Sequence, residues 1–219
     1  QTDIGIVTDI PGISRYAIKV IGRAGHSGTT RMPDRQDALV AASEVITTAQ
    51  DTGIAIAEQD NKHFVATIGR IDVYPNGAAT VPGEVNMVLD LRASHEHSRD
   101  EFLRQLQTEC MQISKNRSCK IETQLISNAS VAVMDNDLRQ RLSHAAKSLN
   151  LSHIDLSSGA GHDMVHLSRI APAAMVFIPC KDGLSHCPEE FASAEAIAKG
   201  SAVLARTILA LASDELNKG

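Results

Sequence analysis

The stretch SGAGHDMVHLSRIAPAAMVFIPCKDGLSHCPEE, residues 158–190, decides the fold of the second half of the chain. Its apolar run, residues 171–180, is rich in Val, Ile and Phe and bounded by prolines, which is typical of a strand buried on both faces. His162 precedes this run and His186 follows it. Ligand sites of α/β sheets lie at the ends of buried strands, so the pair indicates a site, although either residue alone could be an ordinary loop histidine.

A fully buried strand needs a neighbour on each side, because its backbone groups must be hydrogen bonded. Residues 4–8 could supply one neighbour, but the rest of residues 128–219 is expected to form helices, including a long one over about residues 193–212. The sequence therefore predicts an incomplete α/β domain. The chain also starts at Gln1 directly before an apolar run, and we expect it to be a piece of a longer protein.

A different pattern fills the region between Arg15 and Ile126. Four strands are expected over residues 15–22, 64–73, 84–92 and 119–126. Asp34 is expected to cap a helix that ends near Gly53, and Ser98 with Glu101 a capping box for a second helix. This second helix has an expected core stripe of Leu103, Leu106, Cys110 and Ile113. The β-α-β-β-α-β order predicts a ferredoxin-like sandwich.

Composition excludes several classes of protein. The 219 residues are 43% hydrophobic and 21% charged, as in ordinary globular proteins, and the net charge of −5 without a basic block argues against nucleic acid. We expect no membrane partner, since no apolar stretch approaches the roughly 20 residues of a membrane span. The four cysteines form no CxxC pair, so a reducing cytoplasm is predicted.

Three residues are candidates for chemistry. His186 could bind zinc, with Glu190 as its better supporting partner, but zinc needs three or four ligands and no HExxH or paired-Cys spacing accompanies it. His26, in a Gly-Ser-Thr loop, could stabilise an oxyanion or simply be solvated. Arg92 could bind a substrate carboxylate, but a salt bridge to Asp90 or Glu84 is the simpler interpretation.

The remaining histidines, His63, His95, His97, His144, His153 and His166, receive no role. A serine hydrolase is a rival interpretation, because Ser185 neighbours His186 and Asp163 neighbours His162. It has little support, since no GxSxG motif is present and adjacent residues cannot form a catalytic triad by themselves.

Four motifs carry a resemblance to a known family. RYAIKVIGRAGHSGTTRMPDRQDAL (residues 15–39), VPGEVNMVLDLR (81–92), SGAGHDM (158–164) and GLSHCPEE (183–190) resemble those of the amidase, hydantoinase and carbamoylase family of zinc-dependent hydrolases. Members of that family include N-carbamoyl-L-amino-acid hydrolases, allantoate amidohydrolases and β-alanine synthases. The motifs occur in the family's order and span nearly the whole chain.

The resemblance implies a ferredoxin-like lid inserted in a two-zinc aminopeptidase-like α/β catalytic domain. Residues 1–12 and 128–219 would belong to the catalytic domain, which is incomplete here. Residues 13–127 would form the lid, through which such enzymes make homodimers. The implied reaction is hydrolysis of a carbamoyl or amide bond by metal-activated water, on a small substrate that carries a carboxylate.

The resemblance also assigns roles to individual residues. His186 looks like the last zinc ligand, and His26 looks like the lid histidine that polarises the scissile carbonyl in a partner subunit's site. Arg92 looks like the residue that binds the substrate carboxylate, while Gly161 and His162 look like substrate contacts beside the metals. The expected cofactor is zinc, two ions per subunit, with manganese, cobalt or nickel as substitutes.

Two departures from the family pattern bear on function. The family's other zinc ligands and its general-base glutamate precede the region matched here, so this chain alone is expected to be inactive. Ala79 stands where the family has a substrate-binding Asn, and Cys187 stands where Asn is common. Two alternatives therefore stay open: a peptidase or aminoacylase of the same superfamily, and a non-catalytic dimerising or ligand-binding module.

Overall fold

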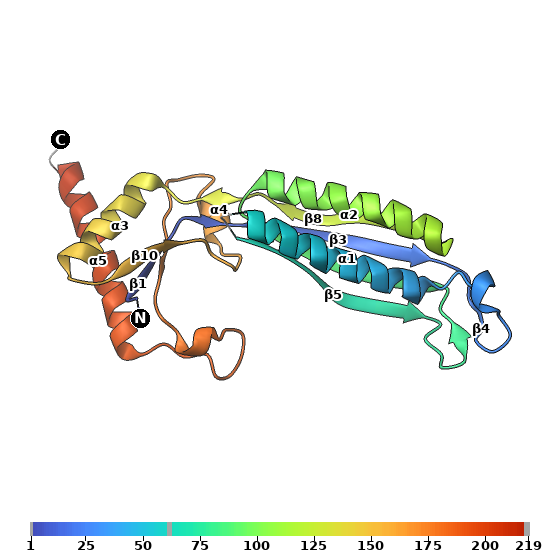
Figure 1. The fold of residues 1–219 in the computed structure, drawn as a ribbon. Helices are drawn as coiled ribbons and strands as arrows, with labels where there is room; N and C mark the ends of the chain where they lie inside the picture. The colour runs from blue at the N-terminus through green and yellow to red at the C-terminus, as the bar shows by residue number, and fades with distance from the viewer. Residues whose placement is uncertain (1, 61–62, 217–219) are drawn as a thin grey trace. The chain divides into compact units, whose positions relative to one another are not determined.

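The computed structural model describes residues 2–60 and 63–216, and its chain divides into two compact units. Unit 1 comprises Gln1–Ile10 and Ala132–Gly219, and unit 2 comprises Pro11–Val131. Both units combine sheet with helix, so the predicted mixed α/β class is confirmed (Figure 1). Unit 2 is inserted into the sequence of unit 1.

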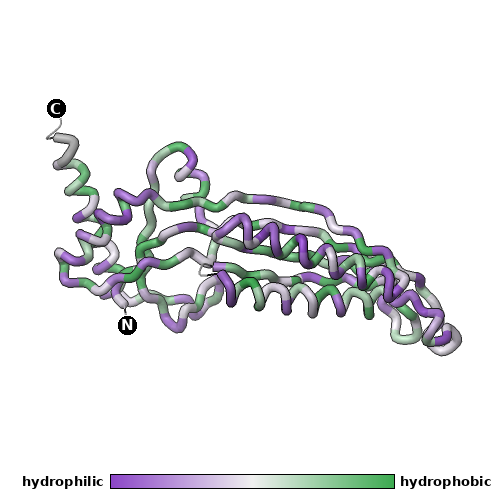
Figure 2. Tube along the Cα trace, turned by 45° about the horizontal axis from the view of Figure 1, so that its top comes forward, coloured by the Kyte–Doolittle hydropathy of each residue, from purple (hydrophilic) through white to green (hydrophobic). Residues whose placement is uncertain are grey.

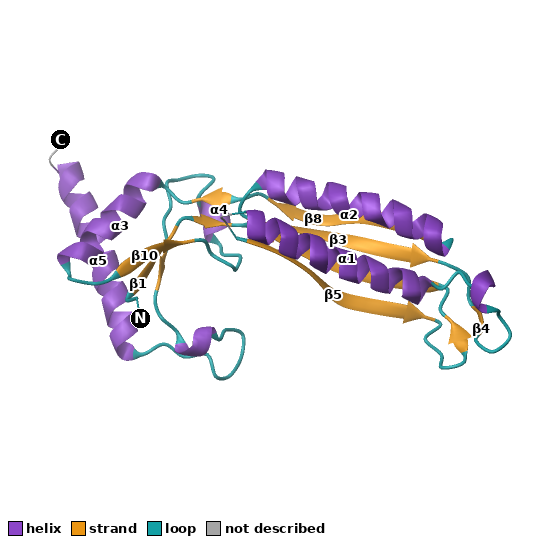
Figure 3. Cartoon of the chain, viewed as in Figure 1, coloured by secondary structure: helices purple, strands orange, loops and turns teal. Residues whose placement is uncertain are grey.

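The main sheet of unit 2 is antiparallel. Its strands are β3 (Gly12–Ile21), β5 (Phe64–Tyr74), β7 (Glu84–Ala93) and β8 (Lys120–Ala129), in the spatial order β5-β7-β3-β8 (Figure 3). The two central strands pair over their whole length, with Ile18 opposite Met87. Both of these side chains are buried, because alternate residues of each central strand point to the same face.

Two long helices cover one face of this sheet, α1 (Ala38–Gln59) and α2 (Glu96–Arg117) (Figure 1). Hydrophobic and hydrophilic residues alternate along both helices, as expected where each helix buries one side (Figure 2). Phe102 of α2 is completely buried against Phe64 of β5, with ring centroids 5.7 Å apart. Leu103, which the sequence placed in the stripe, is only partly buried, so the core-facing side of α2 is turned towards Phe102.

The ends of both helices differ from the predictions. Asp37, not Asp34, caps α1: its carboxylate accepts hydrogen bonds from the N–H groups of Leu39 and Val40. Asp34 is the last residue of a 3-10 turn, η1 (Met32–Asp34), which ends before α1 begins. The predicted capping box of Ser98 is wrong, because α2 begins earlier, after His95, and the Ser98 hydroxyl donates to Asp60 instead.

Unit 1 is built around β1 (Ile4–Val7), whose four residues are all buried. β10 (His153–Leu156) pairs with it in parallel and β11 (Val176–Phe177) antiparallel, giving the order β10-β1-β11. The prediction that residues 171–180 form the fully buried strand is therefore wrong. Only two of them form a strand, both are half-buried, and that strand lies at the edge of the described sheet.

Shorter elements complete unit 1. A second pair of strands, β2 (Asp9–Ile10) and β9 (Ala132–Val133), follows β1, and α3 (Asn136–Ser148) packs against β1. α4 (Met164–Leu167) and the 3-10 turn η2 (Lys181–Gly183) flank β11 in the sequence. Ile4 and Ile6 form the core of the unit with residues of α3 and with Val203.

The last helix of unit 1, α5 (Ala194–Leu216), packs on α3. Its segment Ala194–Ser213 is long and apolar enough to cross a membrane by length and composition, so the expectation that no stretch approaches that length is wrong. Ala196, Val203 and Thr207 are buried, while Ile208 and Leu209 are exposed. The helix thus buries one side in unit 1 and carries apolar residues on its exposed side as well.

Candidate functional site

The loop that carries His26 is held by main-chain bonds to a second loop of unit 2. β4 (Gly25–His26) pairs antiparallel with β6 (Thr80–Val81), and the Ser27 N–H donates to the Ala79 carbonyl at 2.9 Å. The AGHSGTT and VPG motifs, far apart in sequence, therefore form one structure. Ala79 contributes its carbonyl oxygen to this structure, which any residue at that position could do.

A local hydrogen bond selects one tautomer of the neutral His26 ring. The Gly28 N–H donates to Nδ1 of His26 at 3.0 Å. A neutral imidazole whose Nδ1 accepts a hydrogen bond carries its proton on Nε2. The side chain is exposed. His26 therefore presents an Nε2–H donor to a molecule that binds at this loop, which is what stabilising a carbonyl oxygen requires.

Arg35 supports the same loop, and sequence reasoning gave it no role. Its Nη2 donates to the Ser27 carbonyl at 2.5 Å and its Nε to the Thr30 carbonyl at 3.1 Å. The Thr30 N–H in turn donates to the carbonyl of His26 at 3.0 Å. A guanidinium that binds two carbonyls of one loop restricts the backbone that follows His26, so the histidine lies on an ordered loop.

Arg92 lies on β7, on the face of the sheet opposite the buried Leu89 and Leu91. Its Nε donates to Asp90 Oδ1 at 2.8 Å, and Asp90 Oδ2 accepts from Arg15 at 3.0 Å. The salt bridge to Asp90 that the sequence offered as the simpler interpretation is present. The Arg92 side chain is 29% exposed, so the guanidinium is held by protein groups and still reaches solvent.

Gly161 and His162 lie in unit 1, just before α4. The His162 ring contacts Phe177 of β11, with centroids 5.6 Å apart, and the His162 carbonyl accepts from the Val165 N–H at 3.0 Å. Gly161 and His162 are both exposed. The SGAGHDM motif is thus placed beside the strand that the sequence expected to carry a site, although that strand is shorter than predicted.

His186 lies in a tight turn of unit 1 after η2. It adopts a left-handed conformation, with φ of 59°, and its N–H donates to Glu190 Oε2 at 2.9 Å. The Glu190 N–H closes the turn by donating to the Cys187 carbonyl at 3.1 Å. Glu190 therefore supports the backbone of His186, which orients the exposed ring indirectly.

A zinc centre needs at least three protein ligands, and His186 does not meet that condition with the residues around it. Among residues 2–60 and 63–216, one group of three metal-binding side chains is found: Asp60, His95 and His97, all in unit 2. Sequence reasoning gave these two histidines no role. No catalytic step through a metal at His186 follows from the described part of the chain.

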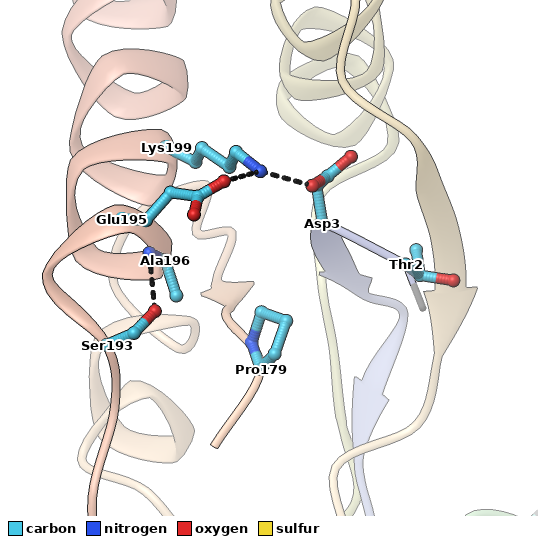
Figure 4. A pocket seen from close by; sticks show the side chains of 7 residues that line it. All are labelled: Thr2, Asp3, Pro179, Ser193, Glu195, Ala196 and Lys199. Carbon is cyan, nitrogen blue, oxygen red and sulfur yellow. Dashed lines mark hydrogen bonds and ion pairs between the residues drawn. The ribbon is translucent and has the colours of Figure 1, made fainter. Parts of the chain in front are cut away.

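A cavity of about 180 Å³ lies in unit 1, at the start of β1 and of α5 (Figure 4). Lys199 donates there to Asp3 at 2.8 Å and to Glu195 at 2.6 Å. These bonds raise the pKa of Lys199 from 10.5 to about 12, and the bonds from Lys199 and Ser152 hold the pKa of Asp3 well below its ordinary value. None of the predicted site residues lines this cavity, so we interpret the cluster as a clasp between β1 and α5.

Comparison with known proteins identifies relatives of the whole chain. The model of peptidase family M20/M25/M40 matches residues 5–210. The chain is 35% identical over 211 residues to an N-carbamoyl-L-amino-acid amidohydrolase of Paenarthrobacter aurescens, covering 96% of this chain and 50% of the relative. It is 33% identical over 213 residues to a ureidoglycolate hydrolase of Arabidopsis thaliana, covering 97% and 44%. An allantoate amidohydrolase of Bacillus subtilis is 30% identical over 210 residues, covering 96% and 50%.

A solved structure gives the same result. The chain superposes on an amidase of the hydantoinase/carbamoylase family from Burkholderia multivorans with a TM-score of 0.87 and 32% identity, covering 95% of this chain and 50% of that one. The chain spans about half the length of the curated relatives that it matches. By family model, sequence and fold, it belongs to peptidase family M20/M25/M40 and is similar within it to amidases of the hydantoinase/carbamoylase type.

Proposed function

We propose that this chain is the lid and part of the catalytic domain of a metal-dependent amidohydrolase acting on N-carbamoyl amino acids or ureido acids such as allantoate. The proposal is supported by relatives whose names specify hydrolysis of N-carbamoyl amino acids, ureidoglycolate and allantoate. Because the chain spans about half of these proteins, the activity is that of the intact enzyme. A cytoplasmic location stays a prediction from the cysteines.

The two units take different parts in this proposal. Unit 2 is the ferredoxin-like lid: its chain order β3-α1-β5-β7-α2-β8 and sheet order β5-β7-β3-β8 agree with that arrangement. Unit 1 is a part of the catalytic domain and contains Gly161, His162 and His186. The domain boundaries then lie near Ile10 and Val131.

The observation that carries the proposal is the hydrogen bond from Gly28 to Nδ1 of His26. It leaves the proton on Nε2, so a neutral His26 can donate to a carbonyl oxygen as negative charge develops on it. His26 thereby polarises the scissile carbonyl. In the proposed homodimer it does so in the site of the partner subunit.

Arg92 binds the substrate carboxylate in this proposal. N-carbamoyl amino acids and ureido acids both carry a carboxylate, and a guanidinium matches it with paired N–H donors. The ion pair with Asp90 orients the guanidinium without burying it. Gly161 and His162 contact the substrate from unit 1.

His186 contributes one metal ligand, and the other ligands and the general base come from residues outside this chain. Zinc is the proposed ion, with manganese, cobalt or nickel as substitutes; when bound, it supplies an activated water for attack on the carbonyl carbon. The chain by itself is therefore expected to be inactive. What its own residues do is bind the substrate carboxylate, donate to the carbonyl oxygen and hold one side of the metal.

The first test replaces His26 in the intact enzyme. His26→Ala removes one oxyanion donor, which costs about 10²- to 10³-fold in kcat. His144→Ala is the matched control, since His144 is an exposed histidine on α3 that the proposal does not use. An unchanged kcat for His26→Ala, with the same fold by circular dichroism, would overturn the assignment.

The second test replaces Arg92. Loss of charge-assisted bonds worth about 1.5–3 kcal/mol predicts that Arg92→Ala raises KM for N-carbamoyl amino acids by roughly 10- to 100-fold. Arg70→Ala is the control, because Arg70 forms a similar ion pair with Asp72 on β5 and is 70% exposed. Unchanged kinetics for Arg92→Ala would exclude it from carboxylate binding.

A peptidase or aminoacylase is the alternative within the same family. Ala79 favours it, since a methyl side chain cannot make the substrate hydrogen bond that an Asn makes in the carbamoylases. Assaying the intact enzyme with dipeptides and with N-carbamoyl amino acids separates the two activities. Activity towards neither class would favour the non-catalytic module.

We propose that β8 carries the homodimer interface. It is an edge strand of the sheet, and Leu125 and Ile126 on it are 51% and 55% exposed. An edge strand can pair with its copy across a two-fold axis and bury such residues. Sedimentation of the protein should give a dimer, which Leu125→Lys combined with Ile126→Lys should convert to a monomer; a wild-type monomer at micromolar concentration would contradict this.

A further inference from the structure

The end of α1 and the start of α2 bring three metal-binding side chains together in unit 2. Asp60 follows the last residue of α1, and His95 and His97 lie at the start of α2. The two helices run side by side on the sheet (Figure 1), so residues 35 positions apart in the sequence meet here. One ligand atom of each residue lies within 4.8 Å of the others.

The carboxylate of Asp60 is at the centre of this group. Its side chain is 5% exposed, and Oδ1 lies 3.0 Å from Nδ1 of His95. Its other oxygen accepts a hydrogen bond from the Ser98 hydroxyl. A buried carboxylate held by two neighbours has a fixed position. Metal binding therefore does not have to order this ligand.

The two imidazoles lie against each other beside this carboxylate. Their ring centroids are 5.1 Å apart and their planes 26° from parallel. Nε2 of His97 lies 3.3 Å from the Ser98 hydroxyl, the same group that bonds to Asp60. His95 is one-third exposed and His97 is exposed, so an ion can reach the group from solvent.

One carboxylate oxygen and two imidazole nitrogens are the ligand set of a borderline metal ion, above all zinc, and not of magnesium or calcium. Donor atoms about 2.1 Å from one zinc lie roughly 3.4 Å apart. The three ligand atoms therefore need to move from within 4.8 Å to that separation. The exposed His97 ring can supply most of this movement by turning about its side-chain torsions.

We propose that Asp60, His95 and His97 bind one zinc ion, with water as the fourth ligand, and that the ion joins α1 to α2. Ser98 acts as a positioning residue, because its hydroxyl fixes the carboxylate through the oxygen opposite His95. All three ligands lie within unit 2. Zinc that binds to this chain would then be bound by residues of unit 2 and not by His186.

A hydrogen-bonded cluster without metal is the competing explanation, and His97 separates the two. In that cluster Asp60 bonds to His95 and Ser98, while His97 contributes its contact with Ser98 and its ring contact with His95. His97→Ala should then change little. In a zinc site the same substitution removes one of three ligands and weakens zinc binding by about tenfold or more.

The test is a calorimetric titration of the 219-residue chain with zinc chloride after chelator treatment and dialysis, combined with thermal melts. We expect one ion per chain, a Tm that rises with zinc, and loss of both effects in His97→Ala and Asp60→Asn. His144→Ala is the matched control and should bind as the wild type does, whereas His186→Ala tests whether the ion lies at the proposed catalytic ligand instead. His97→Ala is the decisive variant, since His95→Ala also removes the ion pair with Asp60 and can destabilise the fold.

Three results would overturn the proposal. Zinc binding of equal affinity in His97→Ala and in the wild type would place the ion elsewhere. Binding that disappears in His186→Ala but persists in His97→Ala would place it at the proposed catalytic ligand. No heat and no change in Tm at millimolar zinc would mean that the group is only a hydrogen-bonded cluster.

Discussion

The sterics around two glycines of unit 2 predict opposite effects of the same substitution. Gly22 follows β3, where the chain leaves the sheet towards the His26 loop, and a methyl group there would lie 2.1 Å from the carbonyl oxygen of Gln36. Gly53 lies within α1, and a methyl group there would lie 3.5 Å from Cβ of Ala66, which is ordinary contact. Alanine should therefore destabilise the protein at Gly22 and stabilise it at Gly53.

The magnitudes follow from the contacts. At Gly22 the overlap is more than about 1 Å, and it involves backbone that cannot rotate away. Moving this backbone disrupts two hydrogen bonds, from the Arg23 N–H to the Gln36 carbonyl and from the Gly22 N–H to the Gly83 carbonyl. Each is 2.8 Å long and worth about 1 kcal/mol. With a packing cost of about 1–3 kcal/mol added to these two bonds, the loss is roughly 3–5 kcal/mol. At Gly53 the gain is the helix preference of alanine, about 1 kcal/mol.

Thermal melts followed by circular dichroism measure both effects. For a unit of this size, 1 kcal/mol corresponds to about 3–6 °C, so Gly22→Ala should lower Tm by roughly 10 °C or more and Gly53→Ala should raise it by about 3–5 °C. A Tm within about 2 °C of the wild type for Gly22→Ala would refute the close approach to Gln36. A clear fall in Tm for Gly53→Ala would refute the packing of α1 on β5.

Helix capping and the unit 1 clasp give further predictions. Asp37→Ala should destabilise the protein by about 1 kcal/mol in urea unfolding, since it removes the cap of α1. Asp34→Ala should change the free energy of unfolding little. Equal effects of the two substitutions would contradict the assigned cap. Asp3 has a lowered pKa, so its contribution is complete above its ordinary pKa of 3.8 and is lost as the pH falls through the lower, folded value. Lys199 has a raised pKa, so its contribution is complete below 10.5 and is lost as the pH rises through about 12. Lys199→Met should therefore lower Tm between about pH 4 and 10 and flatten its dependence on alkaline pH, and an unchanged profile would show that the clasp contributes nothing.

The order and type of the main strands and helices of unit 2 could be predicted from the sequence. Alternation along β7 places Val85, Met87, Leu89 and Leu91 on one face of the strand, and all four are buried. Three of the four stripe residues predicted on α2, Leu106, Cys110 and Ile113, are buried, and Phe102 takes the place of the fourth, Leu103. Periodicity gives the type of an element reliably because side-chain direction is local, whereas the phase of a helix depends on where the opposing sheet lies.

The motifs also determined the family, since residues at fixed spacing can be matched without knowledge of their contacts. Tertiary structure decided what those residues touch. The proton position of His26 depends on its hydrogen bond with Gly28. The sequence left two ion-pair partners open for Arg92, and the folded chain pairs it with Asp90. A hydrogen-bond partner is chosen by the folded backbone, which brings one of several chemically equivalent groups within reach.

Unit 1 and the Asp60 group show what only the tertiary structure could decide. The apolar run of residues 171–180 predicts burial, but β1 occupies the centre of the described sheet and β11 its edge. Strand order depends on pairing between distant segments, such as β1 and β10. Asp60 and His95 are 35 positions apart, and each looked unremarkable in its own segment. Their meeting depends on the packing of α1 beside α2 on one sheet, and no local pattern encodes that distance.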